Sequence, residues 1–148
     1  ACAAIGTSSA GADDETVENA KSFGRNLGII FQIRDDIFDY YDQSKIGKPT
    51  GNDMAEGKLT LPVIYALNTT NDAEMIALAH KVKDGIVTKE EISRLVAFTK
   101  ANGGIDYAEK RMWDFHAQSM ALLDMDVEDG PVKDSLKAYL DYVIERKK

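Results

Sequence analysis

The chain has 148 residues, enough for one domain with a buried core, and its 44% hydrophobic and 29% charged residues give an ordinary soluble balance. The net charge of −7 argues against a nucleic-acid partner, because phosphate-backbone binding needs a basic stripe. Cys2 is the only cysteine, so the sequence favours a reducing compartment and a cytoplasmic location. No apolar run approaches the roughly 20 residues of a membrane span, and no signal peptide is visible.

The first part of the chain predicts two helices. Residues 1–10 have the small-residue composition of the tail of a helix that closes at Gly11. They lack an initiator methionine, so we expect the chain to begin inside a longer protein. Asp13 is placed to cap a second helix, from about Asp14 through Tyr41, whose first-turn acids suit the helix dipole.

Residues 43–61 change the character of the chain. They contain three glycines, one proline and three lysines, and they show no apolar periodicity. This pattern predicts a long loop, and long loops in compact domains are usually functional or disordered. Pro62 then suits the first turn of the next helix.

The remaining sequence is helical throughout. Thr88 with Glu91 forms a capping-box pattern, and Gly103-Gly104 is a stop signal. Four further helices are expected at residues 71–84, 89–101, 105–123 and 132–145. No stretch has the pattern of a strand. The sequence therefore predicts an all-α fold, a bundle of about six or seven helices in a single domain over residues 1–148.

Three carboxylates lie near the end of the second predicted helix. Asp35 and Asp39 are one helical turn apart with Asp36 beside them, and Gln32 joins their stripe one turn earlier. The opposite arc is apolar and runs to Tyr41, so we expect it to be buried and the acids to face open space. Like charges repel on a helix, which leaves either a solvated acidic face or a cation site. Oxygen-only ligands suit Mg²⁺ shared with substrate phosphates.

Two lysines follow the acids in the predicted loop. Lys48 and Lys58 come nine and nineteen residues after Asp39, and the glycines would let this loop fold back over the acidic helix end. A metal ion held by these carboxylates, with lysines beside it, would form a diphosphate site. Such a site would stabilise the negative charge that develops on a diphosphate leaving group. The alternative is a loop whose lysines only maintain solubility.

Several motifs then occur in a fixed order. Residues 24–67 contain FQ before the acids, DDxxD, and then GK, GxD, EGK and TLP, while GGIDYA and the terminal YVIERKK follow later. This ordered set resembles the second aspartate-rich region of the trans-polyprenyl diphosphate synthases, which are class I chain-elongating prenyltransferases. The likeness extends over nearly the whole chain.

The resemblance implies an activity and a metal. Members of this family join isopentenyl diphosphate to an allylic diphosphate by ionisation, condensation and elimination, and release pyrophosphate. Three Mg²⁺ ions bind the allylic diphosphate between two DDxxD motifs on facing helices. Asp35 would be the direct metal ligand from the second motif, and Asp36 and Asp39 would act largely through bound water.

The resemblance also implies roles for other residues. Lys48 would contact the allylic diphosphate, with Lys58 as a second lysine near it, and Gln32 would line the cavity near the reacting carbons. Asp53 and Glu56 match motif positions without an assigned role. Family members are commonly homodimers, so the full-length protein is expected to be one.

The departures from the family are large. The family chain is about twice this long, and the first DDxxD, the basic residues that hold isopentenyl diphosphate and a Lys-Thr pair are absent from this sequence. We therefore predict that this chain alone is inactive. A non-catalytic, synthase-like regulatory or binding subunit is the main alternative. A terpene cyclase is disfavoured because its usual second metal motif contains Asn and Ser or Thr, and a calcium module because no EF-hand spacing is present.

Overall fold

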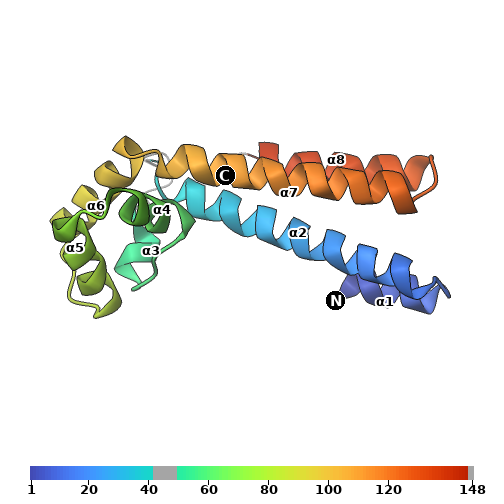
Figure 1. Ribbon diagram of the computed structural model, residues 1–148, viewed down its shortest axis with the longest axis horizontal. Coiled ribbons are helices and arrows are strands. Elements are labelled where there is room, and N and C mark those ends of the chain that lie inside the picture. The colour runs from blue at the N-terminus through green and yellow to red at the C-terminus, as the bar shows by residue number, and fades with distance from the viewer. Residues whose placement is uncertain (42–49, 147–148) are drawn as a thin grey trace. The chain divides into compact units, whose positions relative to one another are not determined.

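The computed structural model describes residues 1–41 and 50–146, and in these ranges it contains helices and no strand (Figure 1). The helices are α1 (Cys2–Ser9), α2 (Asp14–Phe38), α3 (Asn52–Ala55), α4 (Leu61–Thr70), α5 (Ala73–Lys83), α6 (Lys89–Ala101), α7 (Gly104–Asp126) and α8 (Pro131–Glu145). The all-α prediction is confirmed. None of these helices is both long and apolar enough to cross a membrane.

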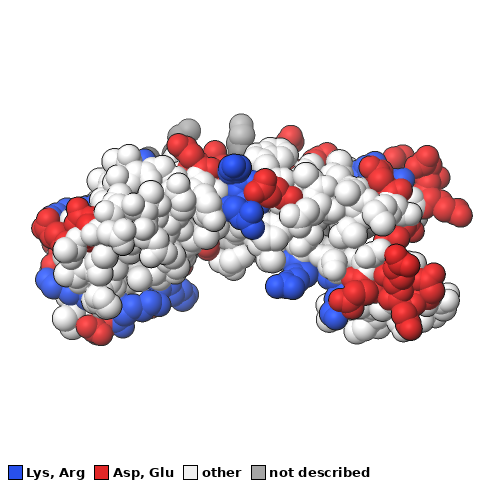
Figure 2. Space-filling view, in the orientation of Figure 1, with Lys and Arg blue, Asp and Glu red and all other residues white. Residues whose placement is uncertain are grey.

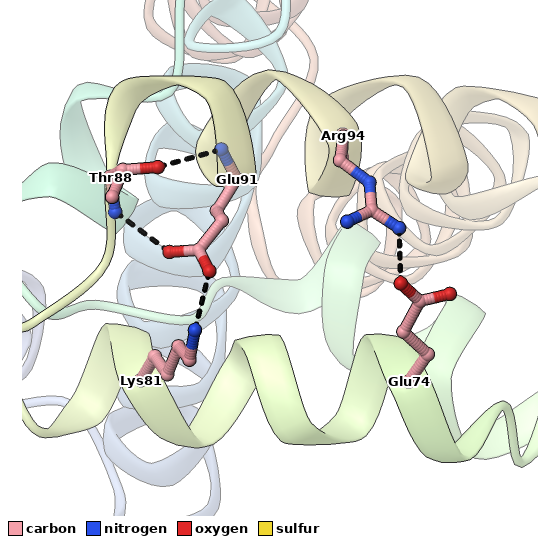
Figure 3. Close-up of polar contacts among 5 residues, drawn as sticks. All are labelled: Glu74, Lys81, Thr88, Glu91 and Arg94. Carbon is pink, nitrogen blue, oxygen red and sulfur yellow. Dashed lines mark hydrogen bonds and ion pairs between the residues drawn. The ribbon is translucent and has the colours of Figure 1, made fainter.

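Local capping signals set most helix boundaries. The Asp13 carboxylate accepts a hydrogen bond from the Thr16 amide at 2.8 Å and so starts α2. The capping box of α6 is complete, because Thr88 Oγ1 accepts from the Glu91 amide at 3.3 Å and Glu91 Oε2 accepts from the Thr88 amide at 2.9 Å (Figure 3). Such side chains satisfy amides that have no partner inside the helix.

Two boundaries differ from the predictions. Helix α2 ends at Phe38 and not at Tyr41, because the Tyr40 and Tyr41 amides donate to carbonyls three residues back, at 3.1 and 3.2 Å. This tighter pattern is common where a helix ends. Helix α3 lies inside the stretch predicted as loop, so that prediction was wrong for residues 52–55. Residues 42–49 lie outside the described part of the chain.

The chain divides into two compact units. The first comprises residues 1–34 and 111–148. Within it α7 and α8 lie side by side (Figure 1), since Lys137 Nζ is 2.6 Å from Asp124 Oδ1 and His116 Nε2 is 2.7 Å from Asp141 Oδ1. Its buried apolar side chains are Phe23, Ile30, Ile33, Met112, Leu123, Leu140, Val143 and Ile144.

The second unit comprises residues 35–110 and is organised around α6, which packs against α3, α4 and α5. The α5–α6 pair also carries two ion pairs on its surface (Figure 3), Lys81–Glu91 at 2.5 Å and Arg94–Glu74. Buried α6 side chains are Ile92, Leu95, Val96 and Thr99. The expectation of one domain over residues 1–148 stays a prediction.

Acidic side chains gather at two places in the first unit (Figure 2). One group begins α2, and the other surrounds the turn between α7 and α8. In the second group, the nearly buried Lys133 ammonium lies 2.8 Å from Asp129 and 3.4 Å from Asp124. Both carboxylates are therefore paired with a lysine whose side chain is nearly buried.

Candidate metal and diphosphate site

The end of α2 and the residue directly after it carry the three aspartates of the DDxxD motif. Asp35 and Asp36 lie in the last turn of α2, and Asp39 follows Phe38, where the helix ends. Asp35 and Asp39 are partly exposed, whereas Asp36 is only 7% exposed. The expectation that all three face open space was wrong for Asp36. At 100° per residue, Asp36 borders the buried arc formed by Ile33 and Ile37, while Asp35 and Asp39 lie on the other side of the helix.

Asp39 is tied to the chain segment that follows the undescribed residues. Its Oδ1 accepts a hydrogen bond from the Asn52 amide at 3.0 Å, and its Oδ2 accepts from the Asp53 amide at 3.1 Å. Its carbonyl oxygen accepts from the Gly51 amide at 3.0 Å. The residue that directly follows α2 therefore holds the start of α3 with three hydrogen bonds.

Gly51 makes this junction sterically possible. Its φ of +79° is a left-handed conformation that favours glycine, and a Cβ atom built there would lie 2.4 Å from Ile92 Cγ2. The residue is buried against α6. The glycine of the GxD motif is thus required by both backbone conformation and space.

Lys58 follows α3 at the surface. Its ammonium lies 2.7 Å from Glu56 Oε2, and both side chains are more than half exposed. A hydrogen bond and charge from Glu56, with a smaller contribution from Asp53, raise the pKa of Lys58 above its usual value. Lys58 is therefore a cation, and it is paired with the carboxylate of its own EGK motif.

For Gln32 and Lys48, the other two predicted site residues, the structure gives less information. Gln32 is exposed on α2, one helical turn before Asp35 and Asp36. Lys48 lies outside the described residues. The structure thus brings together Asp39 and the segment that leads to Lys58, while the roles assigned to Gln32 and Lys48 stay predictions.

Tyr40 is a buried residue that the sequence analysis overlooked. It is 2% exposed, whereas Tyr41, which we expected on the buried arc, is 50% exposed. The reversal follows from the end of α2 at Phe38, after which helical periodicity no longer applies. Burial raises the pKa of Tyr40 to about 12, although the nearby side chains of Thr60 and Thr99 oppose the shift.

The donor atoms suit a hard cation, but they do not enclose one. Among residues 1–41 and 50–146, no group of three or more His, Cys, Asp or Glu side chains is arranged to hold a metal ion. Carboxylate oxygens are nevertheless the ligand type that Mg²⁺ prefers, together with several waters and substrate phosphates. A Mg²⁺ ion at Asp35 would therefore need most of its ligands from water, diphosphate or other carboxylates.

The end of α8 contacts α2 inside the first unit. Arg34 Nη2 donates to the Arg146 carbonyl oxygen at 3.2 Å, and Arg146 Nη2 donates to the Phe31 carbonyl oxygen at 3.4 Å. The Arg146 guanidinium also lies 3.9 Å from the centre of the Phe31 ring. No sequence pattern could have found these contacts, because the partners are more than 100 residues apart.

The sequence profile of the polyprenyl synthetase family matches residues 1–98. The chain belongs to this family. It is 35% identical to the geranylfarnesyl diphosphate synthase of Aeropyrum pernix over 150 aligned residues, which cover all of this chain and 46% of that protein. It is 37% identical to the geranylgeranyl diphosphate synthase of Mycobacterium tuberculosis, covering 74% of this chain and 31% of that protein.

Solved structures of polyprenyl synthases also match this chain. The crystal structure of geranylgeranyl pyrophosphate synthase from Bacteroides thetaiotaomicron matches with a TM-score of 0.92 and 49% identity, over 98% of this chain and 48% of that one. Polyprenyl synthase from Caulobacter crescentus, solved with calcium and isoprenyl diphosphate, matches with a TM-score of 0.80 and 26% identity, over 98% and 44% of the two chains. Like other members of the polyprenyl synthetase family that it matches, this chain is all-α, but it spans about half their length or less.

Proposed function

We propose that this chain is the second aspartate-rich half of a polyprenyl diphosphate synthase. Such an enzyme condenses isopentenyl diphosphate with an allylic diphosphate to make an all-trans polyprenyl diphosphate. The observation that carries this proposal is the end of α2, where DDxxD is joined by hydrogen bonds to the segment leading to Lys58. Family membership supports the reaction class. The arrangement of DDxxD beside the segment that leads to Lys58 supports diphosphate binding at this position.

In this proposal Asp35 is a direct ligand of Mg²⁺, and Asp36 and Asp39 act through metal-bound water. The partial exposure of Asp35 and the burial of Asp36 suit this division. When bound, Mg²⁺ would neutralise diphosphate oxygens and so favour departure of the leaving group. The Caulobacter crescentus relative, solved with a divalent cation and isoprenyl diphosphate, supports this chemistry.

Lys58 and Lys48 would contact the allylic diphosphate. Lys58 is exposed and forms a surface ion pair with Glu56, and a contact of this kind contributes little net stability and is easily exchanged. Gln32 would line the cavity near the reacting carbons. The homodimer and the cytoplasmic location expected for the full-length protein stay predictions.

The 148-residue chain by itself is expected to be inactive, because it has one DDxxD motif where the reaction needs two facing ones. The test is therefore a chimera in which the first half of the Bacteroides thetaiotaomicron synthase is fused before residue 1. The high structural similarity of the two proteins makes this junction reasonable. Product would be measured from labelled isopentenyl diphosphate with dimethylallyl, geranyl or farnesyl diphosphate and Mg²⁺.

We expect polyprenyl diphosphate from the chimera and none from the chain alone. Asp35→Asn in the chimera should lower kcat by about 100-fold or more, since a ligand that stabilises the leaving group is worth several kcal/mol. A chimera that folds as judged by circular dichroism yet makes no product would contradict the proposal and favour the non-catalytic subunit. Full activity of the Asp35→Asn chimera would contradict the role of Asp35.

A further inference from the structure

Asp39 is bonded to the backbone of a later segment through both of its carboxylate oxygens and its carbonyl oxygen. Its two carboxylate oxygens accept hydrogen bonds from the backbone amides of Asn52 and Asp53, one each. Its carbonyl oxygen accepts a third hydrogen bond, from the Gly51 amide. Asn52 and Asp53 are the first two residues of α3, and Gly51, its N-cap residue, makes no side-chain cap. Amides at these positions have no acceptor inside their own helix. Asp39, thirteen residues earlier, therefore supplies the cap that α3 lacks.

A second hydrogen bond connects this junction to Lys58, the lysine of the EGK motif. The Asp53 amide donates to Asp39, and the Asp53 carbonyl oxygen in turn accepts from the Lys58 amide at 2.8 Å. Two hydrogen bonds thus connect the Asp39 carboxylate to the backbone of Lys58. The backbone that enters α3 is further restrained at Gly51, which has a left-handed conformation and lies close to the Ile92 side chain.

We propose that Asp39 is a positioning residue that holds the segment 51–58 against the end of α2 at residues 35–38. The consequence for diphosphate binding rests on the proposed function, because it acts through Lys58. A carboxylate can accept about four hydrogen bonds, so two acceptor positions remain for metal-bound water. Direct ligation of a metal ion by Asp39 would compete with the charge-assisted hydrogen bonds that hold the start of α3.

The test measures the clamp directly, by hydrogen exchange of backbone amides followed by nuclear magnetic resonance on the 148-residue chain without metal. In Asp39→Ala the Asn52 and Asp53 amides should exchange about 10- to 100-fold faster, as expected for loss of a bond to a charged acceptor. Asp39→Asn keeps the shape but has one acceptor oxygen, so one of the two amides should lose protection. The Leu95 amide in the core of α6 reports whether the variant stays folded.

Asp35→Asn is the matched control, because it removes a carboxylate charge from the same helix and leaves the Asp39 bonds intact. It should not change exchange at Asn52 or Asp53. The same measurement is then repeated on the unmodified chain with Mg²⁺ and inorganic pyrophosphate. A positioning role predicts that both amides stay protected when these probes are added.

Two results would overturn the proposal. One is unchanged exchange at both amides in Asp39→Ala with the Leu95 amide still protected. The other is faster exchange of these amides on addition of Mg²⁺ and pyrophosphate, which would show that Asp39 leaves α3 to ligate the metal. The metal-free comparison decides the role of Asp39 whether or not either probe binds, and the chimera assay tests the proposed function separately.

Discussion

Gly51→Ala is the substitution whose cost the structure defines most closely. The added methyl group must adopt a backbone φ of +79°, and its Cβ would lie 2.4 Å from Ile92 Cγ2 and 3.4 Å from Val96 Cγ2. Ile92 is 7% exposed and β-branched, so it has little freedom to move away. The change therefore combines backbone strain with overpacking.

The two contributions can be estimated separately. A non-glycine residue in the left-handed region costs about 1–2 kcal/mol. An extra methyl group in a packed core costs about 1–3 kcal/mol. Gly51→Ala should thus lower the free energy of unfolding by about 2–5 kcal/mol, a large part of the stability of a domain this size.

Gly85→Ala provides the matched control. Gly85 also has a left-handed φ, of +70°, but an added Cβ would meet nothing within 4 Å. It should cost the backbone strain alone, about 1–2 kcal/mol. The assay is unfolding in guanidinium chloride followed by circular dichroism, with both variants compared with the unmodified chain. Equal unfolding midpoints and slopes for Gly51→Ala and Gly85→Ala would refute the steric part of the argument. A second test introduces Gly51→Ala into the Ile92→Ala background, where the smaller side chain should lower its cost. An unchanged cost in that background would also refute the steric clash.

Two further predictions concern the second unit. Because the unfolded chain releases the Tyr40 proton near pH 10 and the folded chain holds it to a pKa of about 12, the free energy of unfolding should fall by about 2 kcal/mol as the pH rises from 10 to 12. Tyr40→Phe should lack this part of the pH dependence in denaturant titrations, and equal pH slopes would contradict the assignment. Thr88→Ala should cost about 1 kcal/mol by removing half of the capping box. Thr69→Ala, which removes an exposed hydroxyl bonded only to a helix carbonyl, is the control and should be close to neutral in the same thermal unfolding measurement.

Sequence reasoning worked where the signal is local. Asp13, the Thr88–Glu91 pair and Pro62 each fix a helix start within one or two residues, because a cap acts on the amides next to it. Motif order also identified the family correctly, since DDxxD followed by GxD and EGK is far more specific than any single motif.

It failed where a distant partner determines the outcome. Helix α3 has too few residues to show periodicity, and its cap comes from Asp39, thirteen residues before Asn52 and just past the end of α2. The burial of Asp36 depends on which edge of α2 is covered, which the motif does not encode. The contacts of Arg146 with Phe31 and Arg34 join residues more than 100 positions apart, so no window of sequence contains them.

The Asp39 junction also has a consequence for the order of folding. Its partners are only twelve to fourteen residues away along the chain, and closing a loop of about ten residues takes on the order of 10–100 ns. The packing of Gly51 on Ile92 spans a longer loop, and such non-local contacts form more slowly. We therefore expect the turn that carries the GxD and EGK motifs to form as a local structure before α6 docks on it.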